Sequence, residues 1–162
     1  MNITSLVCKQ VNASAVRSAE AHACLPVNLA DAFISWWDEN YRSAVILPET
    51  YINIYIYPNW LPVLQTHPFP EYKSGHSVVS SSAAIMLTTF FGDNFAFADS
   101  TEEEFGLPTR NYSSFKKAAE EAAISRFYGG IHYMPTIANG QGEGYAIGEF
   151  FVNKLNTRKY KG

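Results

Sequence analysis

The amino-acid sequence predicts an all-α protein, a helical bundle of about five helices with a proline-rich extended crossover between the first and second helical parts. Residues 77–91 are mostly small and apolar and carry no charge, and Gly92 follows them, as expected for a buried helix. Residues 12–41 place Ala, Leu, Trp and Phe at helical spacing. Only residues 51–57 alternate as a strand does, and a single strand has no partner with which to pair.

The composition predicts one folded domain over residues 1–162, because 47% of the residues are hydrophobic and 15% are aromatic. The net charge is −3 and no basic stripe is present, so nucleic acid is not an expected partner. No apolar run reaches the roughly 18–20 residues of a membrane span, and residues 1–10 lack the apolar core of a signal peptide. The cellular location stays open, and a periplasmic or secreted protein is expected if an upstream signal had been removed. Cys8 and Cys24 are too few for a disulfide framework.

The first half of the chain divides into a helical part and a proline-rich part. Residues 12–41 form the helical part, which Pro26 is expected to kink or divide. Residues 43–72 contain five prolines and are therefore read as an extended crossover laid over the helices, with room for a helical turn. These prolines are Pro48, Pro58, Pro62, Pro68 and Pro70.

The second half predicts three helices. Ser74 is a suitable cap for the helix at 77–91, and an acidic loop over residues 92–110 follows it. The next helix spans about 112–127, because a Ser-Ser cap signal opens it and a Gly-Gly pair follows it. The last helix is expected to begin after Gly140 and to run past Phe150. The glycines of "NGQGEGYAIG" indicate close packing of helix backbones and not a dinucleotide loop, since no strand precedes them.

The sequence "SGH" at residues 74–76 is the first candidate site. The first turn of a helix has unpaired N–H groups and a partial positive charge, which suit a phosphate-like anion. Gly75 would let a ligand approach the backbone, Ser74 adds a hydroxyl donor, and His76 could carry a proton to or from the anion. The alternative is a plain helix cap with a surface histidine.

Arg126 and His132 form the second candidate. Arg126 shares a helix face with Phe115, Ala118, Ala119 and Ala122, and a guanidinium on an apolar face is costly unless it meets an anion or a carboxylate. His132 follows six residues later, so both side chains could converge with the first candidate on one oxyanion. The alternative is a packed His132 with an internal salt bridge from Arg126, for example to Asp31 or Asp38.

Two stretches together resemble a known family. "PFPEYKSGHSVVSSSAA" and "SFKKAAEEAAISRFYGGIHY" are similar to the vanadium-dependent haloperoxidases and to the related type-2 phosphatidic-acid phosphatases. The similarity extends to "LADAFISWWDENYRSAVILPETY", covers about residues 29–150, and corresponds to the C-terminal half of the haloperoxidases.

The resemblance implies a role for each matching residue. His132 would bind vanadate axially, as the one ligand to the metal, or would attack phosphorus in a phosphatase. His76 would be the acid/base, and Ser74, the Gly75 backbone and Arg126 would hold equatorial oxygens. Vanadate is the one cofactor implied, and a small oxyanion, phosphate or vanadate, is the implied partner.

Three positions depart from the family pattern. Asn40 stands where the family has a lysine, and Leu47 stands where it has an arginine. Ala138 lies where the family commonly has an aspartate that orients the second histidine, so His132 is expected to lack an orienting carboxylate. Lys73, directly before the serine of the first candidate, is the better substitute cation, ahead of Arg42.

These departures predict a family member with a partial anion pocket and weakened or lost catalysis. The alternatives are an active phosphatase-like hydrolase, or a vanadate-dependent haloperoxidase, that uses His132 and His76, and a non-catalytic structural or interaction module. Apolar surface left uncovered where the family's N-terminal half has no counterpart is expected either to drive homo-oligomer formation or to make the chain unstable by itself.

Overall fold

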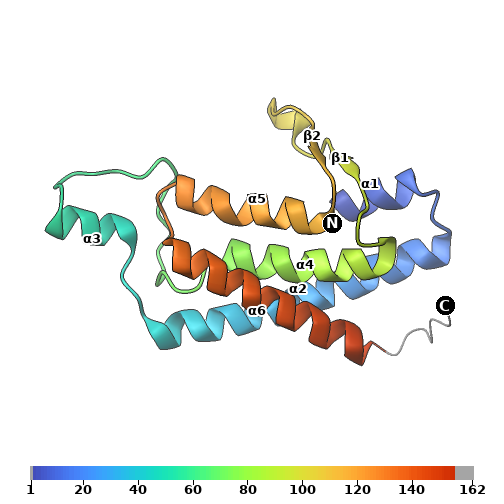
Figure 1. Cartoon of the computed structure of the whole chain (residues 1–162), viewed down its shortest axis with the longest axis horizontal. Coiled ribbons are helices and arrows are strands. Elements are labelled where there is room, and N and C mark those ends of the chain that lie inside the picture. The colour runs from blue at the N-terminus through green and yellow to red at the C-terminus, as the bar shows by residue number, and fades with distance from the viewer. Residues whose placement is uncertain (1, 156–162) are drawn as a thin grey trace.

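Helix α4 (Gly75–Phe91) lies at the centre of a helical bundle in the computed structural model, which describes residues 2–155 (Figure 1). The other elements are α1 (Asn2–Gln10), α2 (Ala15–Ser43), α3 (Pro48–Tyr55), β1 (Phe97–Asp99), a 3-10 turn (Glu103–Phe105), β2 (Arg110–Tyr112), α5 (Phe115–Tyr128) and α6 (Met134–Lys154). Helices α2, α5 and α6 pack around α4. The prediction of an all-α bundle is confirmed. None of the helices in residues 2–155 has an apolar stretch long enough to cross a membrane.

Helix α2 is a continuous helix of 29 residues that contains Pro26. The hydroxyl of Ser14 caps it by accepting a hydrogen bond from the backbone N–H of Arg17. It ends at Ala44, whose left-handed conformation (φ 47°) turns the chain away. Of the two effects predicted for Pro26, a kink or a division, division does not occur, because the helix is continuous through this residue.

The crossover after α2 contains a helix that the sequence analysis did not predict. Pro48 occupies the first turn of α3, where its missing N–H has no intrahelical partner to lose. The prediction of an extended crossover is therefore wrong for residues 48–55, although the chain from there to α4 has no regular element. Helix α3 stands away from the bundle, and Ile54 and Tyr55 are 60% and 68% exposed (Figure 1).

Glycines bring α4 and α6 into close contact. A Cβ atom added to Gly144 would lie 2.2 Å from the carbonyl oxygen of Val78, and one added to Gly148 would lie 2.7 Å from Ile85 Cβ. The predicted close packing of helix backbones is confirmed. Helix α6 begins at Met134, earlier than predicted.

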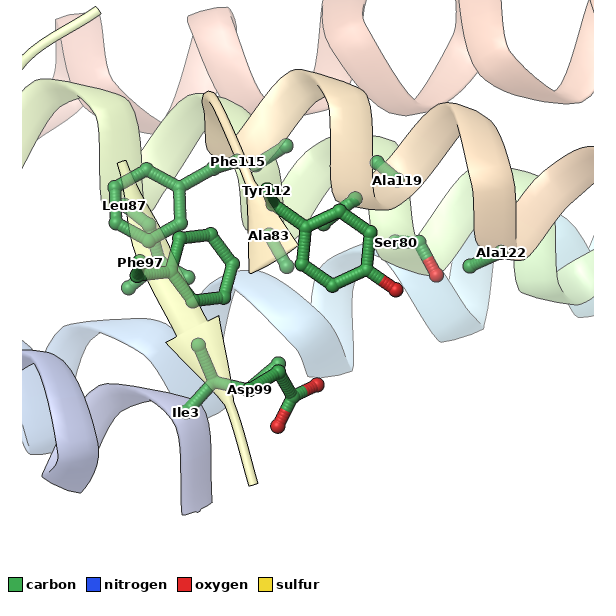
Figure 2. Close-up of a pocket in the computed structure, with 12 residues that line it drawn as sticks. Ile3, Ser80, Ala83, Leu87, Phe97, Asp99, Tyr112, Phe115, Ala119 and Ala122 are labelled. Atoms are coloured by element: carbon green, nitrogen blue, oxygen red, sulfur yellow. The ribbon is translucent and has the colours of Figure 1, made fainter. Parts of the chain in front are cut away.

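The acidic loop at 92–110 folds into a small antiparallel hairpin, in which Phe97 pairs with Tyr112. The ring of Phe97 stacks on Phe115 at the start of α5, with centroids 5.1 Å apart. A cavity of about 210 Å³ lies beside these rings (Figure 2). It is mainly apolar, and the carboxylate of Asp99 at its edge accepts two hydrogen bonds from Thr101, so it offers no cluster of donors for an anion.

Candidate oxyanion site

His76, in the first turn of α4, and Arg126, in the last turn of α5, meet at one end of the bundle. Arg126 Nη1 lies 3.4 Å from His76 Nε2, and because a guanidinium only donates, Nε2 is the acceptor. Both residues line a cavity of about 490 Å³ together with Gly75 and His132. The structure thus brings together four of the residues that the sequence singled out.

The His76 ring is held in its neutral form. Partial desolvation among the cavity walls, then the positive charge of Arg126 and the electrostatic effect of His132, lower the pKa of His76 to about 4. The ring is exposed at the cavity mouth, so solvent limits the desolvation. An anion placed between His76 and Arg126 would offset the guanidinium charge and raise this pKa, which is what an acid/base next to a bound oxyanion requires.

Arg126 has no carboxylate partner among the described residues. Its Nε donates to the Ser125 hydroxyl at 3.0 Å. Asp38, one of the partners considered from the sequence, pairs instead with Arg42 on the exposed face of α2. The guanidinium is half-buried and remains available for an anion.

Ser74 and Gly75 have structural duties at the start of α4. Ser74 is fully buried and its oxygen caps the helix by accepting from the Ser77 N–H at 3.4 Å, which leaves its own hydrogen to donate. Gly75 packs directly on Trp36, because an added Cβ would lie 2.7 Å from the indole ring. A larger residue at position 75 would therefore clash with Trp36, so the packing explains the glycine without any ligand.

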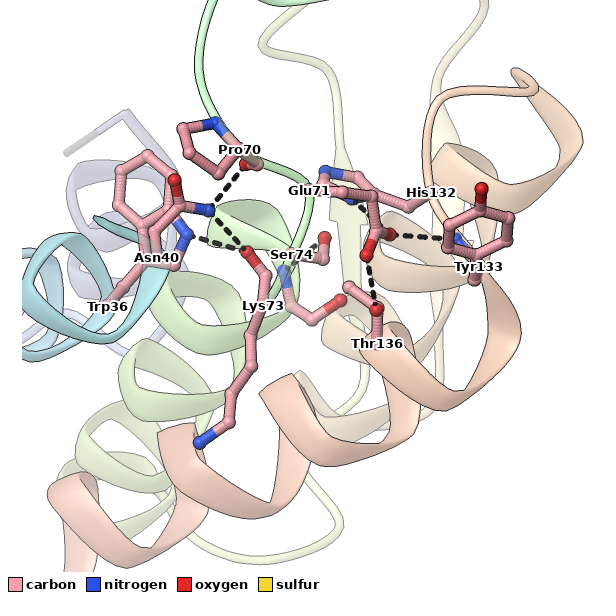
Figure 3. Close-up of polar contacts among 10 residues, drawn as sticks. Trp36, Asn40, Pro70, Glu71, Lys73, Ser74, His132, Tyr133 and Thr136 are labelled. Atoms are coloured by element: carbon pink, nitrogen blue, oxygen red, sulfur yellow. Dashed lines mark hydrogen bonds and ion pairs between the residues drawn. The ribbon is translucent and has the colours of Figure 1, made fainter. Parts of the chain in front are cut away.

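A carboxylate orients His132 after all, and it comes from Glu71. His132 Nδ1 donates to Glu71 Oε1 at 3.0 Å, and the backbone N–H of Tyr133 donates to the same oxygen at 2.9 Å (Figure 3). Thr136 Oγ1 donates to Glu71 Oε2 at 2.7 Å. Glu71 is fully buried, and these three hydrogen bonds stabilise its charge. The expectation that His132 lacks an orienting carboxylate is wrong.

Lys73 does not serve the site as predicted. Its side chain runs away from Ser74 and His132, and its Nζ forms a salt bridge of 2.9 Å with Glu143 on α6 (Figure 3). Desolvation is the largest single effect on Lys73 and lowers its pKa. The hydrogen bond to Glu143 and the charge of Glu143 act in the opposite direction, and the net pKa of Lys73 is raised. Arg42 is likewise paired elsewhere.

The three positions for which the sequence predicts a departure from the family pattern lie in different surroundings. Asn40 is fully buried, and its Nδ2 donates to the Pro70 carbonyl at 2.7 Å, so it holds the segment that carries Glu71. Leu47 is the residue before α3 and lines a groove beside Pro70. Ala138 is exposed on α6 and lines a separate groove between α5 and α6, so an aspartate there would not share the cavity of His132.

Two residues of the site were not predicted from the sequence: His67, which lines the cavity, and Glu71, which is buried beside it and holds His132. Glu71 is an isolated acidic residue in the otherwise uncharged run "HPFPEY", and a carboxylate between apolar neighbours is a signal of a buried partner. His67 lies in the same run, and its ring centroid is 4.8 Å from that of His132.

The donor set fits an oxyanion better than a bare metal ion. No group of three His, Cys, Asp or Glu side chains in residues 2–155 is arranged to hold a metal ion. The cavity instead offers one guanidinium, a helix N-terminus and His132, whose Nδ1 is engaged by Glu71 so that Nε2 is the nitrogen left to bind. This set suits vanadate or phosphate, with His132 as the single protein ligand.

The fold and this cavity define a helical-bundle protein with arginine and histidine gathered at one helix N-terminus. The family model described as the VCPO second helical-bundle domain matches residues 55–160. The structure resembles a bacterial vanadium-dependent iodoperoxidase with a TM-score of 0.92 and 54% identity, covering 94% of this chain and 37% of that one. The chain belongs to the helical-bundle domain family of the vanadium haloperoxidases.

More distant structures share the fold alone. The holo-type and apo-type structures of a bacterial vanadium-dependent chloroperoxidase have TM-scores of 0.68 and 0.63, both at 18% identity. They match 80% and 76% of this chain, and 34% and 33% of their own. The chain thus spans about a third of the length of the structures it matches. A search of curated proteins found no match.

Proposed function

We propose that this chain carries an oxyanion pocket of the vanadium haloperoxidase type, which binds phosphate or vanadate more weakly than a complete family site and has weakened or lost catalysis. The observation that carries the proposal is the approach of Arg126 to His76, at 3.4 Å, in a cavity that His132 also lines. In this proposal Arg126 and the N-terminus of α4 hold the anion, His132 binds its central atom, and His76 donates or accepts a proton. Bound vanadate would supply a Lewis-acidic centre that activates peroxide.

The weakening follows from two substituted cations. A hydrogen bond to a charged group contributes roughly 1.5–3 kcal/mol, so two lost contacts remove about 3–6 kcal/mol, or roughly 10² to 10⁴ in affinity. Asn40 and Leu47 stand at the two positions. A phosphoryl-transfer transition state also carries negative charge, so the rate would fall with the affinity.

A second candidate, an active enzyme, is favoured by Glu71. A metal-binding histidine is commonly held by a carboxylate on its other nitrogen, and Glu71 is hydrogen-bonded to His132 in this way. The same contact would orient His132 as the nucleophile in hydrolysis of a phosphate ester. Under this candidate the chain is a phosphatase-like hydrolase or a vanadate-dependent haloperoxidase.

The test combines binding and turnover on the purified chain. Orthovanadate and phosphate are titrated by calorimetry, and hydrolysis of an aryl phosphate is followed at pH 5–6. Millimolar-range vanadate binding without turnover supports the weakened pocket. Turnover that His132→Ala abolishes supports the active enzyme. Absence of binding by either anion overturns the proposal and leaves the non-catalytic module.

Restoring the missing cations sharpens this test. The double substitution Asn40→Lys with Leu47→Arg is expected to raise vanadate affinity by about 10² or more. Ala138→Asp is the control, because it also introduces a family residue but adds a carboxylate and no cation. An equal effect of both changes would show that the gain does not arise in the proposed pocket.

A further inference from the structure

The ring of His67 contacts two other rings in the candidate site, both in a tilted arrangement. Its ring centroid lies 4.0 Å from that of Phe69 and 4.8 Å from that of His132, with interplanar angles of 30° in both cases. The residue lines the same cavity as His76 and Arg126. His67 therefore packs beside the histidine that would bind the anion.

Two different contacts then fix the orientation of the His132 ring. Glu71 holds Nδ1 from within the plane of the ring, at 3.0 Å. This hydrogen bond opposes rotation about the Cβ–Cγ bond of His132, because rotation would carry Nδ1 away from Glu71. A ring packed beside His132 adds to this restraint, because the same rotation would disturb the ring contact. His67 is placed to supply that ring.

His67 is itself held by its backbone surroundings. One ring nitrogen bonds to the backbone of Pro70, and since Nε2 has no partner among the described residues, that nitrogen is Nδ1. Pro70 has a carbonyl but no N–H, so Nδ1–H is the donor. The same carbonyl accepts from Asn40, and the next residue is Glu71. The ring is thus tied to the segment that also supplies the carboxylate.

We propose that His67 is a positioning residue for His132: its ring and the Glu71 carboxylate together aim His132 Nε2 into the cavity. This rests on the proposed function, because aim matters only if Nε2 binds the anion. Phe69 contacts the ring of His67 and limits its movement. Burial, then the electrostatic effect of His132, lower the pKa of His67 to about 4, so the His67 ring is neutral at neutral pH.

The experiment compares His67→Leu with His67→Phe in the full chain. Leucine removes the flat ring while it keeps a similar apolar volume, and phenylalanine keeps a flat ring without the nitrogens. The first readout is vanadate affinity by calorimetry. We expect His67→Leu to weaken binding about threefold to tenfold, the size of a ring contact of this kind, and His67→Phe to stay within about twofold of the original protein.

The second readout is the ¹⁵N NMR spectrum of the His132 ring in the ligand-free protein. In His67→Leu the Nδ1–H signal of His132 should broaden through faster exchange with solvent, because a ring that moves more breaks its hydrogen bond to Glu71 more often, whereas His67→Phe should leave this signal nearly unchanged. Unchanged affinity and unchanged His132 signals in both variants would overturn the positioning role. If the original protein does not bind vanadate, the proposed function is overturned, and with it the role of His67 in anion binding. The NMR readout still reports separately whether His67 restrains the His132 ring.

Discussion

The buried carboxylate of Glu71 allows the most direct test of the site. It accepts three hydrogen bonds, of which two come from donors that cannot turn to other partners, His132 Nδ1 at 3.0 Å and the Tyr133 N–H at 2.9 Å. The third donor is the hydroxyl of Thr136, which can rotate. Removing the carboxylate therefore leaves two buried donors without an acceptor.

The expected loss of stability follows from these contacts. Each orphaned buried donor costs roughly 1–3 kcal/mol, so Glu71→Ala should lower the free energy of unfolding by about 2–6 kcal/mol, a large share of the roughly 5–15 kcal/mol of a typical domain. Glu71→Gln keeps one oxygen for both donors, and its NH₂ group can donate to Thr136. Only the charge is lost, and we expect a loss of about 1–2 kcal/mol.

Urea unfolding measures these changes, and vanadate titration measures the accompanying loss of affinity. For Glu71→Gln we expect affinity to fall about tenfold to a hundredfold, as for other residues that orient a metal-binding histidine. Glu104→Gln is the control, because Glu104 is exposed and should change the free energy of unfolding by less than about 0.5 kcal/mol. The reasoning is refuted if Glu71→Ala is no less stable than this control.

Three further predictions concern packing and charge. Gly144→Ala should destabilise the protein by about 3 kcal/mol in urea unfolding because its Cβ meets the neighbouring backbone, whereas Gly142→Ala, with nothing within 4 Å, should be neutral or stabilising. The free energy of unfolding of the ligand-free protein should fall as the pH decreases from about 6.5 to about 4. The reason is that His67 and His76 become protonated in the unfolded state but not in the folded state, where each has a pKa of about 4. Replacing both histidines by glutamine should flatten this dependence on pH. Arg126→Gln should raise the pKa of His76 in an NMR titration, yet leave it below 6.5 because desolvation remains; an unchanged pKa would contradict the proposed contact.

The sequence predicts the helices whose start and end signals are local. Ser74 and Gly92 define α4 correctly, and the glycines of α6 indicate its close approach to α4. Helix α3 escapes prediction because its alternating pattern resembles a strand, and its opening proline is equally compatible with an extended segment and a first helical turn. Helix α1 was not predicted either, and it is only nine residues long.

The site could be predicted in part, since the motifs of α4 and α5 carry its anion-binding residues. The role of Glu71 could not be predicted, because it depends on a contact with a residue 61 positions later in the chain. The salt bridge of Lys73 could not be predicted either, because only the folded structure brings Glu143 within 2.9 Å of the Lys73 amine. Short-range sequence patterns thus identify which residues carry the chemistry, but not which residues orient them.

The isolated position of α3 has a consequence for how the protein is handled. A helix of eight residues is barely stable in water by itself, and Tyr51, Ile54 and Tyr55 expose apolar surface that the bundle does not cover. If this arm gains cover by self-association, the melting temperature will rise with protein concentration, as for any coupled folding and association. Measurements on dilute and concentrated samples should therefore be compared before any thermal shift is attributed to a bound anion.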